Sequence, residues 1–174
     1  MSHAAVVVLA PNWLGDAVLA LPAIADVRRA FPGSVLAVAA GRSVAGVFRL
    51  VRHVDEVITL RSDSRWWRSA AFRGDAESLR QYNLAILFPN SFQSAWLVKQ
   101  AGVAERWGYR SDVRSRLLTR AVPRVKGGHQ AEYYQRLITA LGMQAGPGAP
   151  AIDLTAETRA AAQQMLAEHG HEAG

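Results

Sequence analysis

The chain has 174 residues, half of them hydrophobic, which suits one folded domain with a sizeable core. No apolar run approaches the roughly 20 residues that span a membrane, and the N-terminus lacks the basic segment of a signal peptide. There is no cysteine, which excludes disulfides and thiol catalysis and is compatible with a reducing cytoplasm.

The net charge is +6, and the whole surplus lies in one segment, residues 106–126. A single aspartate, Asp112, opposes seven basic residues there: Arg106, Arg110, Arg114, Arg116, Arg120, Arg124 and Lys126. Such a patch favours an anionic partner, for example nucleic acid, a phosphorylated glycolipid or an anionic membrane face. The alternative is a solvated basic face without a ligand, because charge runs are usually surface.

The first predicted elements are a buried strand and a long helix. Residues 5–10 form a continuous apolar run rich in valine, typical of a strand buried on both faces of a parallel sheet. Residues 16–31 carry apolar residues at near-helical spacing, with Arg28 and Arg29 near the C-terminal end, where cations suit the helix dipole. Pro22 removes a backbone donor inside this segment, so we expect a kink or a later helix start.

Strands and helices then alternate along the rest of the chain. We expect strands at 35–39, 57–60, 84–88 and 106–109, and helices at 43–51, 64–81, 91–101, 128–141 and 155–169. Ser91 is a suitable N-cap for its helix. The Gly- and Pro-rich residues 142–150 predict a loop or linker, and residues 170–174 offer nothing apolar to pack.

This alternation predicts an α/β fold: a Rossmann-like, open and mainly parallel sheet with helices on both faces. We expect residues 1–150 to form this domain, and residues 151–174 to form a C-terminal helix or linker. Ligands of open α/β sheets bind beyond the carboxyl ends of the strands. Three predicted loops fall there: 11–16, 89–94 and the basic stretch after Tyr109.

The first loop lacks both Gly-x-Gly-x-x-Gly and the phosphate-loop pattern, so dinucleotide binding is disfavoured. It offers Gly15, which permits close backbone approach, and Asp16, which lies where the helix dipole stabilises a carboxylate. Asp16 could accept a proton from a substrate hydroxyl. The alternative is that Asp16 only caps the helix.

The second loop is neutral and hydrogen-bonding. Asn90, Ser91, Gln93 and Ser94 suit sugar hydroxyls, and they equally suit an ordinary turn and cap. His129 has no convincing further ligands nearby in sequence for a metal site, so we expect a structural or acceptor-side role. Trp66 and Trp67 fit packing in the core or between domains better than contact with lipid.

Four segments together resemble the lipopolysaccharide heptosyltransferases, glycosyltransferase family nine. The first is residues 7–18 followed by Leu21 and Pro22. Residues 87–95, 106–110 with 116–118, and 129–134 follow in the family's order, and the second and third of the four are similar to the heptosyltransferase II branch in particular. Gln93 departs from the pattern, since a lysine is common at that position in relatives, so the resemblance does not imply an anion contact there.

The resemblance implies two facing Rossmann-like domains: an N-terminal one for the anionic inner core of lipopolysaccharide and a C-terminal one for ADP-heptose. It implies inverting transfer of heptose without a metal or other cofactor, with Asp16 as general base. Acceptor-binding residues are then expected in the three loops and at the start of the following helix: Asn12, Trp13, Gly15, Asn90, Ser91, Gln93, Arg110, Arg114, Arg116 and His129. Arginine suits this acceptor because it binds carboxylate and phosphate in bidentate fashion.

The chain stops where the second domain of that family should begin, so we expect it to be inactive alone and to bind ADP-heptose weakly or not at all. The resemblance places the protein in the cytoplasm, compatible with peripheral contact at the inner membrane's cytoplasmic face. Two other classes compete with it. A basic nucleic-acid-binding module fits the charge but has no recognisable motif, and a receiver-like domain lacks the acidic cluster that magnesium needs.

Overall fold

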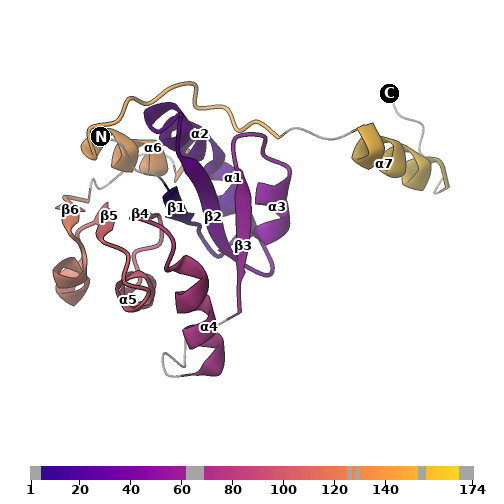
Figure 1. Cartoon of the computed structure of the whole chain (residues 1–174). Helices are drawn as coiled ribbons and strands as arrows, with labels where there is room; N and C mark the ends of the chain where they lie inside the picture. Colours follow the sequence, from indigo (N-terminus) through magenta and orange to yellow (C-terminus); the bar gives the residue numbers. More distant parts are fainter. Residues whose placement is uncertain (1–4, 62–68, 125–126, 128–129, 153–155, 169–174) are drawn as a thin grey trace.

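The computed structural model describes residues 5–61, 69–124, 127, 130–152 and 156–168. Its centre is a six-stranded sheet in which every pairing is parallel, in the order β3-β2-β1-β4-β5-β6 (Figure 1). The strands are β1 (Ala5–Leu9), β2 (Val35–Gly41), β3 (Glu56–Leu60), β4 (Leu84–Leu87), β5 (Glu105–Tyr109) and β6 (Arg120–Val122). The predicted fold class is confirmed.

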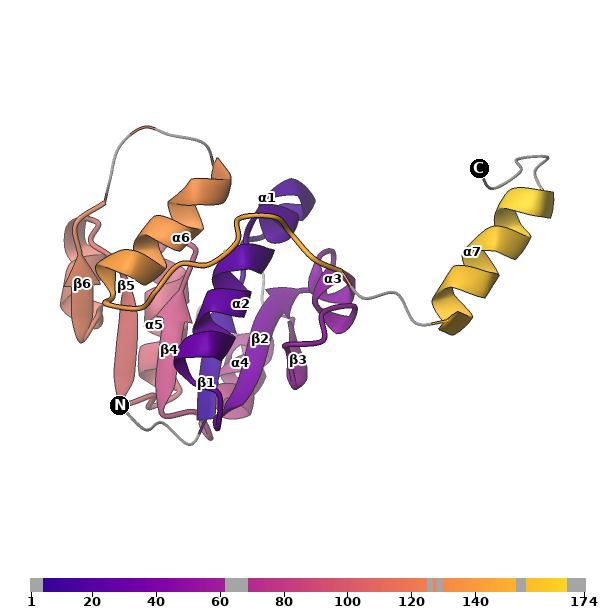
Figure 2. The same ribbon diagram turned by 90° about the horizontal axis from the view of Figure 1, so that it is seen from above.

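Helices cover both faces of the sheet (Figure 2). The apolar core on one face takes in residues of α1 (Leu14–Leu19), α2 (Leu21–Ala30), α3 (Ala45–Arg49) and α6 (Gln130–Ala140). The core on the other takes in residues of α4 (Ala70–Leu79), α5 (Phe92–Gln100) and the 3₁₀ helix η1 (Asp112–Leu117). The last helix, α7 (Ala156–Glu168), stands apart from the sheet in both views.

The central strand β1 shows why the apolar run folds as it does. Val6 and Val8 pack into the core on one face, while Val7 and Leu9 pack into the core on the other. All four are at most 2% exposed. A strand that alternates between two buried faces needs apolar residues at every position, which is the pattern that predicted it.

The helix expected over residues 16–31 is two helices. α1 ends at Leu19 and α2 begins at Leu21, with Pro22 in the first turn of α2. Proline fits there because a first-turn amide has no intrahelical acceptor to lose. The predicted interruption at Pro22 is therefore confirmed, whereas α1 begins two residues before the expected start.

Two short elements between residues 112 and 122 escaped prediction. Strand β6 pairs in parallel with β5, and η1 lies between these strands in sequence. Of the three residues of β6, only Val122 is buried, so the segment carries almost no strand periodicity. Its pairing with β5 rather than its composition makes it a strand.

The strand order creates a switch point between β1 and β4. From β1 the chain builds outward through β2 and β3, then returns to the other side of β1 to build β4, β5 and β6. The crossovers on the two sides of this point leave in opposite directions, so the loops after β1 and β4 diverge and leave a crevice at the carboxyl edge. The geometry of the fold thus selects two of the three loops singled out above.

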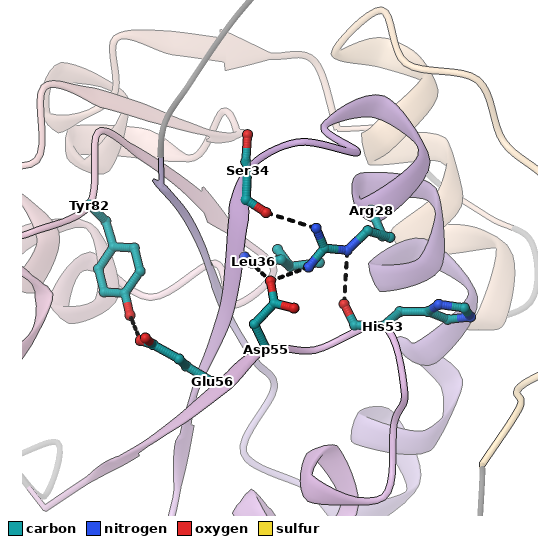
Figure 3. Close-up of polar contacts among 7 residues, drawn as sticks. All are labelled: Arg28, Ser34, Leu36, His53, Asp55, Glu56 and Tyr82. Atoms are coloured by element: carbon teal, nitrogen blue, oxygen red, sulfur yellow. Dashed lines mark hydrogen bonds and ion pairs between the residues drawn. The ribbon is translucent and has the colours of Figure 1, made fainter.

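The opposite, amino-terminal edge of the sheet is closed by a hydrogen-bonded network (Figure 3). Arg28 donates to the carbonyls of Ser34 (2.8 Å) and His53 (3.1 Å) and forms an ion pair with Asp55. Asp55 also accepts from the backbone amide of Leu36 at 2.8 Å. That backbone bond, helped by Arg28, holds the pKa of Asp55 below its ordinary value.

A second buried carboxylate fastens the segment that follows α6. Asp26 on α2 is fully buried, and it accepts from the Gly146 amide at 2.9 Å and from Gln135 at 3.0 Å. It also pairs with Arg29. A Cβ at Gly146 would lie 2.0 Å from the Arg29 guanidinium, so a larger residue there would push this side chain aside.

Candidate functional site at the carboxyl edge

A small hollow lies at the switch point. Its volume is about 90 Å³, and its lining includes Asn12 from the loop after β1, together with Ser91 and Gln93 from the loop after β4. Leu60, the last residue of β3, closes another side. Such a hollow is smaller than a typical ligand pocket of roughly 300–1,000 Å³, so it has room for one substituent of a larger ligand.

Ser91 begins helix α5. Its side chain accepts from the Ser94 amide at 3.2 Å, and the Ser94 hydroxyl donates to the Ser91 carbonyl at 2.8 Å. The expected N-cap is therefore confirmed. The capping bond uses one lone pair of the exposed Ser91 hydroxyl, which keeps its proton for another acceptor.

Asp16 lies in the first turn of α1, two residues after the helix begins at Leu14. The N-cap residue is Trp13, and no side chain forms a capping bond at this helix start. The interpretation of Asp16 as a cap thus finds no hydrogen bond to support it. Among the described residues its half-buried carboxylate has no hydrogen-bond or ion-pair partner, which leaves its lone pairs available to a ligand.

The residues on either side of this carboxylate are open. Trp13 is 77% exposed, the highest value among the large hydrophobic side chains of the described part of the chain. Gly15 is exposed as well, and a Cβ placed there would meet no atom within 4 Å. No group in the described part of this domain thus makes use of the close approach that Gly15 permits.

Asn90 is held from α6, an element that sequence reasoning did not connect to this loop. Its side-chain amide donates to the Tyr133 hydroxyl, while its carbonyl oxygen is buried without a partner in the described part of the chain. The Tyr133 carbonyl in turn accepts from the Tyr109 hydroxyl at 3.0 Å. Burial raises the pKa of Tyr109 to about 12, so this phenol stays protonated and remains a donor.

Arg114 lies inside the protein rather than on its surface. It is 2% exposed, and its guanidinium donates to the carbonyls of Tyr109 and Pro89, the latter at 2.9 Å. Burial lowers its pKa to about 10, which still leaves it charged at neutral pH. Arg114 therefore ties the ends of two neighbouring strands together and does not present its charge to solvent.

The basic segment divides into arginines that contact other groups of the domain and arginines that do not. Arg106 donates to the Leu117 carbonyl at 2.7 Å, and the Arg120 guanidinium lies 5.1 Å from the centre of the Trp107 ring. Arg110 and Arg116 are exposed, and neither side chain has a partner among the described residues. Only part of the positive charge counted in the sequence is thus available to an anionic ligand.

Several predicted residues lie outside the described part of the chain. They are His129, Lys126, Trp66 and Trp67. Within the described part, no group of three or more His, Asp or Glu residues is placed to hold a metal ion. None of the helices described there is both long enough and apolar enough to cross a membrane.

Fold and site together define an α/β domain of the Rossmann type, with a carboxylate, hydroxyl and amide groups and exposed guanidinium groups at its ligand-binding edge. The sequence profile of glycosyltransferase family 9 (heptosyltransferase) matches residues 76–172, and the chain belongs to this family. This membership does not support the nucleic-acid-binding alternative.

Individual relatives agree with that assignment. The chain is 30% identical over 114 residues to lipooligosaccharide heptosyltransferase 2 of Haemophilus ducreyi, an alignment that covers 65% of this chain and 33% of that protein. The solved family 9 glycosyl transferase from Veillonella parvula superposes with a TM-score of 0.83 at 19% identity, covering 97% of this chain and 50% of that one.

Escherichia coli ADP-heptose lps heptosyltransferase II superposes with a TM-score of 0.73 at 22% identity, over 95% of this chain and 50% of that structure. At such identities these two superpositions establish the fold. The chain thus spans about half the length of the solved structures that it matches.

Proposed function

We propose that this chain is the N-terminal, acceptor-binding half of an ADP-heptose:lipopolysaccharide heptosyltransferase that adds heptose to the inner core. Residues 1–150 form the acceptor domain, and residues 151–174 lead toward a second domain that binds ADP-heptose. The half chain alone has no turnover. The proposed setting is the cytoplasm, with peripheral contact at the inner membrane because the acceptor is lipid-anchored.

One observation carries this proposal: in a family 9 chain, the carboxylate of Asp16, which has no partner among the described residues, lies in the first turn of α1, four residues after Asn12, which lines the switch-point hollow. Ser91 and Gln93 supply neutral hydrogen-bonding groups from the other side of the hollow. Hydroxyl and amide groups suit a sugar, and a free carboxylate suits removal of a proton from one of its hydroxyls.

In the proposed reaction Asp16 takes the proton of an acceptor hydroxyl. The oxygen then bonds to the anomeric carbon of heptose as the bond from that carbon to ADP breaks, and the configuration inverts. Positive charge builds up on the sugar ring in the transition state, as in related glycoside chemistry. The proposal includes no metal and no other cofactor.

Arg110 and Arg116 are proposed to bind the phosphate and acidic sugars of the acceptor, because both are exposed and unpaired in the described structure. Trp13, Gly15 and Asn90 complete the proposed acceptor surface, together with His129. Arg114 is instead a positioning residue, since it is buried and its guanidinium donates to the carbonyls of Tyr109 and Pro89.

The test is a calorimetric titration of the chain with deacylated, heptosylated inner-core oligosaccharide, with ADP-heptose titrated in parallel. We expect the oligosaccharide to bind and ADP-heptose to bind weakly or not at all. Arg110→Ala and Arg116→Ala should weaken binding of the oligosaccharide. Arg42 is an exposed arginine after β2, and Arg42→Ala serves as the control. Binding of ADP-heptose alone would show that the wrong ligand has been assigned to this half.

A further inference from the structure

A groove runs between α4 and α5, on the outer side of the helical layer. Its volume is about 410 Å³, and Phe72, Ala76 and Trp96 supply its apolar lining. Arg73 and Glu77 of α4 line it as well, together with Arg80, the C-cap residue of that helix. These residues recur every three or four positions along α4, so a single face of that helix builds one wall.

Aromatic rings continue the groove toward the carboxyl edge. Phe92, at the start of α5, is 50% exposed and stacks on Trp96 with ring centres 6.1 Å apart. The ammonium group of Lys99 lies 5.9 Å from the centre of the Trp96 ring. Phe92 lies between Ser91 and Gln93 in the chain, and those two residues line the switch-point hollow.

The charge around this surface is predominantly positive. Arg73 and Lys99 are exposed, and neither forms an ion pair within the described part of the chain. Arg80 and Glu77 pair with each other at 3.3 Å, so their charges offset each other. The exposed Phe92 ring and the half-buried Trp96 ring, beside unpaired cations with long apolar stems, fit the boundary between lipid headgroups and acyl chains.

We propose that the α4–α5 face, defined by Phe72, Arg73, Ala76, Phe92, Trp96 and Lys99, docks on an anionic lipid surface. The exposed Phe92 ring and the half-buried Trp96 ring enter the headgroup region over the buried Phe72 and Ala76, while Arg73 and Lys99 remain among the lipid phosphates. Charge complementarity selects this occupant, because the two unpaired cations match anionic lipid headgroups. The apolar surface between them is unfavourable in water and would be covered by lipid. The inference gives a location to the membrane contact in the proposed function, but it does not depend on Asp16.

The experiment measures co-sedimentation of the chain with vesicles of phosphatidylcholine, with and without phosphatidylglycerol. We expect binding to the anionic vesicles that weakens as salt is raised. Arg73→Glu with Lys99→Glu should lower the partition coefficient at least about tenfold, since each surface cation contributes severalfold. The matched control, Arg42→Glu with Arg159→Glu, makes the same change in net charge at exposed residues elsewhere.

An apolar pair of variants tests the aromatic contribution. Phe92→Ser should lower partitioning further than Val113→Ser, whose side chain is 64% exposed on η1. Circular dichroism must show equal melting for all variants that are compared. Equal loss in the two charge variants, no binding to anionic vesicles, or burial of this face in a chain dimer detected by light scattering would overturn the proposal.

The design separates this proposal from the proposed function. Asp16→Asn should leave vesicle binding unchanged, and Arg73→Glu with Lys99→Glu should leave calorimetric binding of the deacylated oligosaccharide unchanged. A chain that docks on vesicles but ignores the oligosaccharide would contradict only the proposed function. A chain with the reverse behaviour would contradict only the docking surface.

Discussion

The two edges of the sheet use polar residues in opposite ways. At the amino-terminal edge, Arg28 and Asp55 bond to each other and to backbone groups, and the Tyr82 hydroxyl donates to Glu56 at 2.5 Å (Figure 3). At the carboxyl edge, Asp16 and Arg110 have no side-chain partner among the described residues. Paired groups at the first edge stabilise the fold, whereas groups left unpaired at the second remain available to a ligand.

The largest expected effect is on turnover, and it follows substitution of Asp16, which should leave stability almost unchanged. In a full-length protein that contains this chain, Asp16→Asn should lower turnover by about 10²- to 10⁴-fold, the usual contribution of a general base. The free energy of unfolding should change by less than about 0.5 kcal/mol, since only the interaction with the helix dipole is lost. Heptose transfer and urea denaturation measure the two quantities, and turnover at the unsubstituted rate would remove Asp16 from the mechanism.

Arg114 is the exception at the carboxyl edge, and its removal should be the most destabilising change there. Arg114→Ala should lower the free energy of unfolding by about 3 kcal/mol, because two carbonyls lose a charged donor inside the protein. Arg116→Ala, two residues away on the same 3₁₀ helix but exposed, should stay within about 0.5 kcal/mol. Equal losses in urea denaturation would mean that burial does not distinguish these two arginines.

At the amino-terminal edge, a substitution should affect stability without affecting ligand binding. Arg28→Ala should cost about 2 kcal/mol, because its guanidinium serves two backbone carbonyls and Asp55. Binding of the inner-core oligosaccharide should be unchanged by calorimetry once the variant is folded. Weaker binding of the oligosaccharide with an unchanged free energy of unfolding would reverse the roles assigned to the two edges.

The smallest effect is a pH dependence at Asp55. The pKa of Asp55 is lowered in the folded state. Its contribution to the free energy of unfolding is therefore fully present above the unfolded pKa of roughly 3.9, and it is lost as pH falls through the folded pKa. Asp55→Asn should therefore flatten the fall in Tm on acidification below about pH 4. A fall as steep as in the unsubstituted chain would show that other carboxylates carry the acid sensitivity.

Much of the fold could be predicted because local patterns and tertiary environment agree. The valine run of β1 and the Ser91 cap of α5 each specify their structure within a few residues. Strand β6 could not be predicted, since its three residues acquire strand structure only by pairing with β5. The tie between Asn90 and Tyr133 spans 43 residues and carries no local signal.

The sequence by itself determined the alternation of strands and helices and the three candidate loops, and four of its segments carried the resemblance to family 9; the strand order then selected two of the loops. Periodicity, capping and turn residues act over a few neighbours, so a linear reading recovers them. Only the tertiary structure decided which arginines of the basic segment are available: Arg114 is enclosed, while Arg110 and Arg116 face solvent. The physical reason is that burial and pairing depend on groups brought together by the sheet, whereas formal charge is the same wherever an arginine lies.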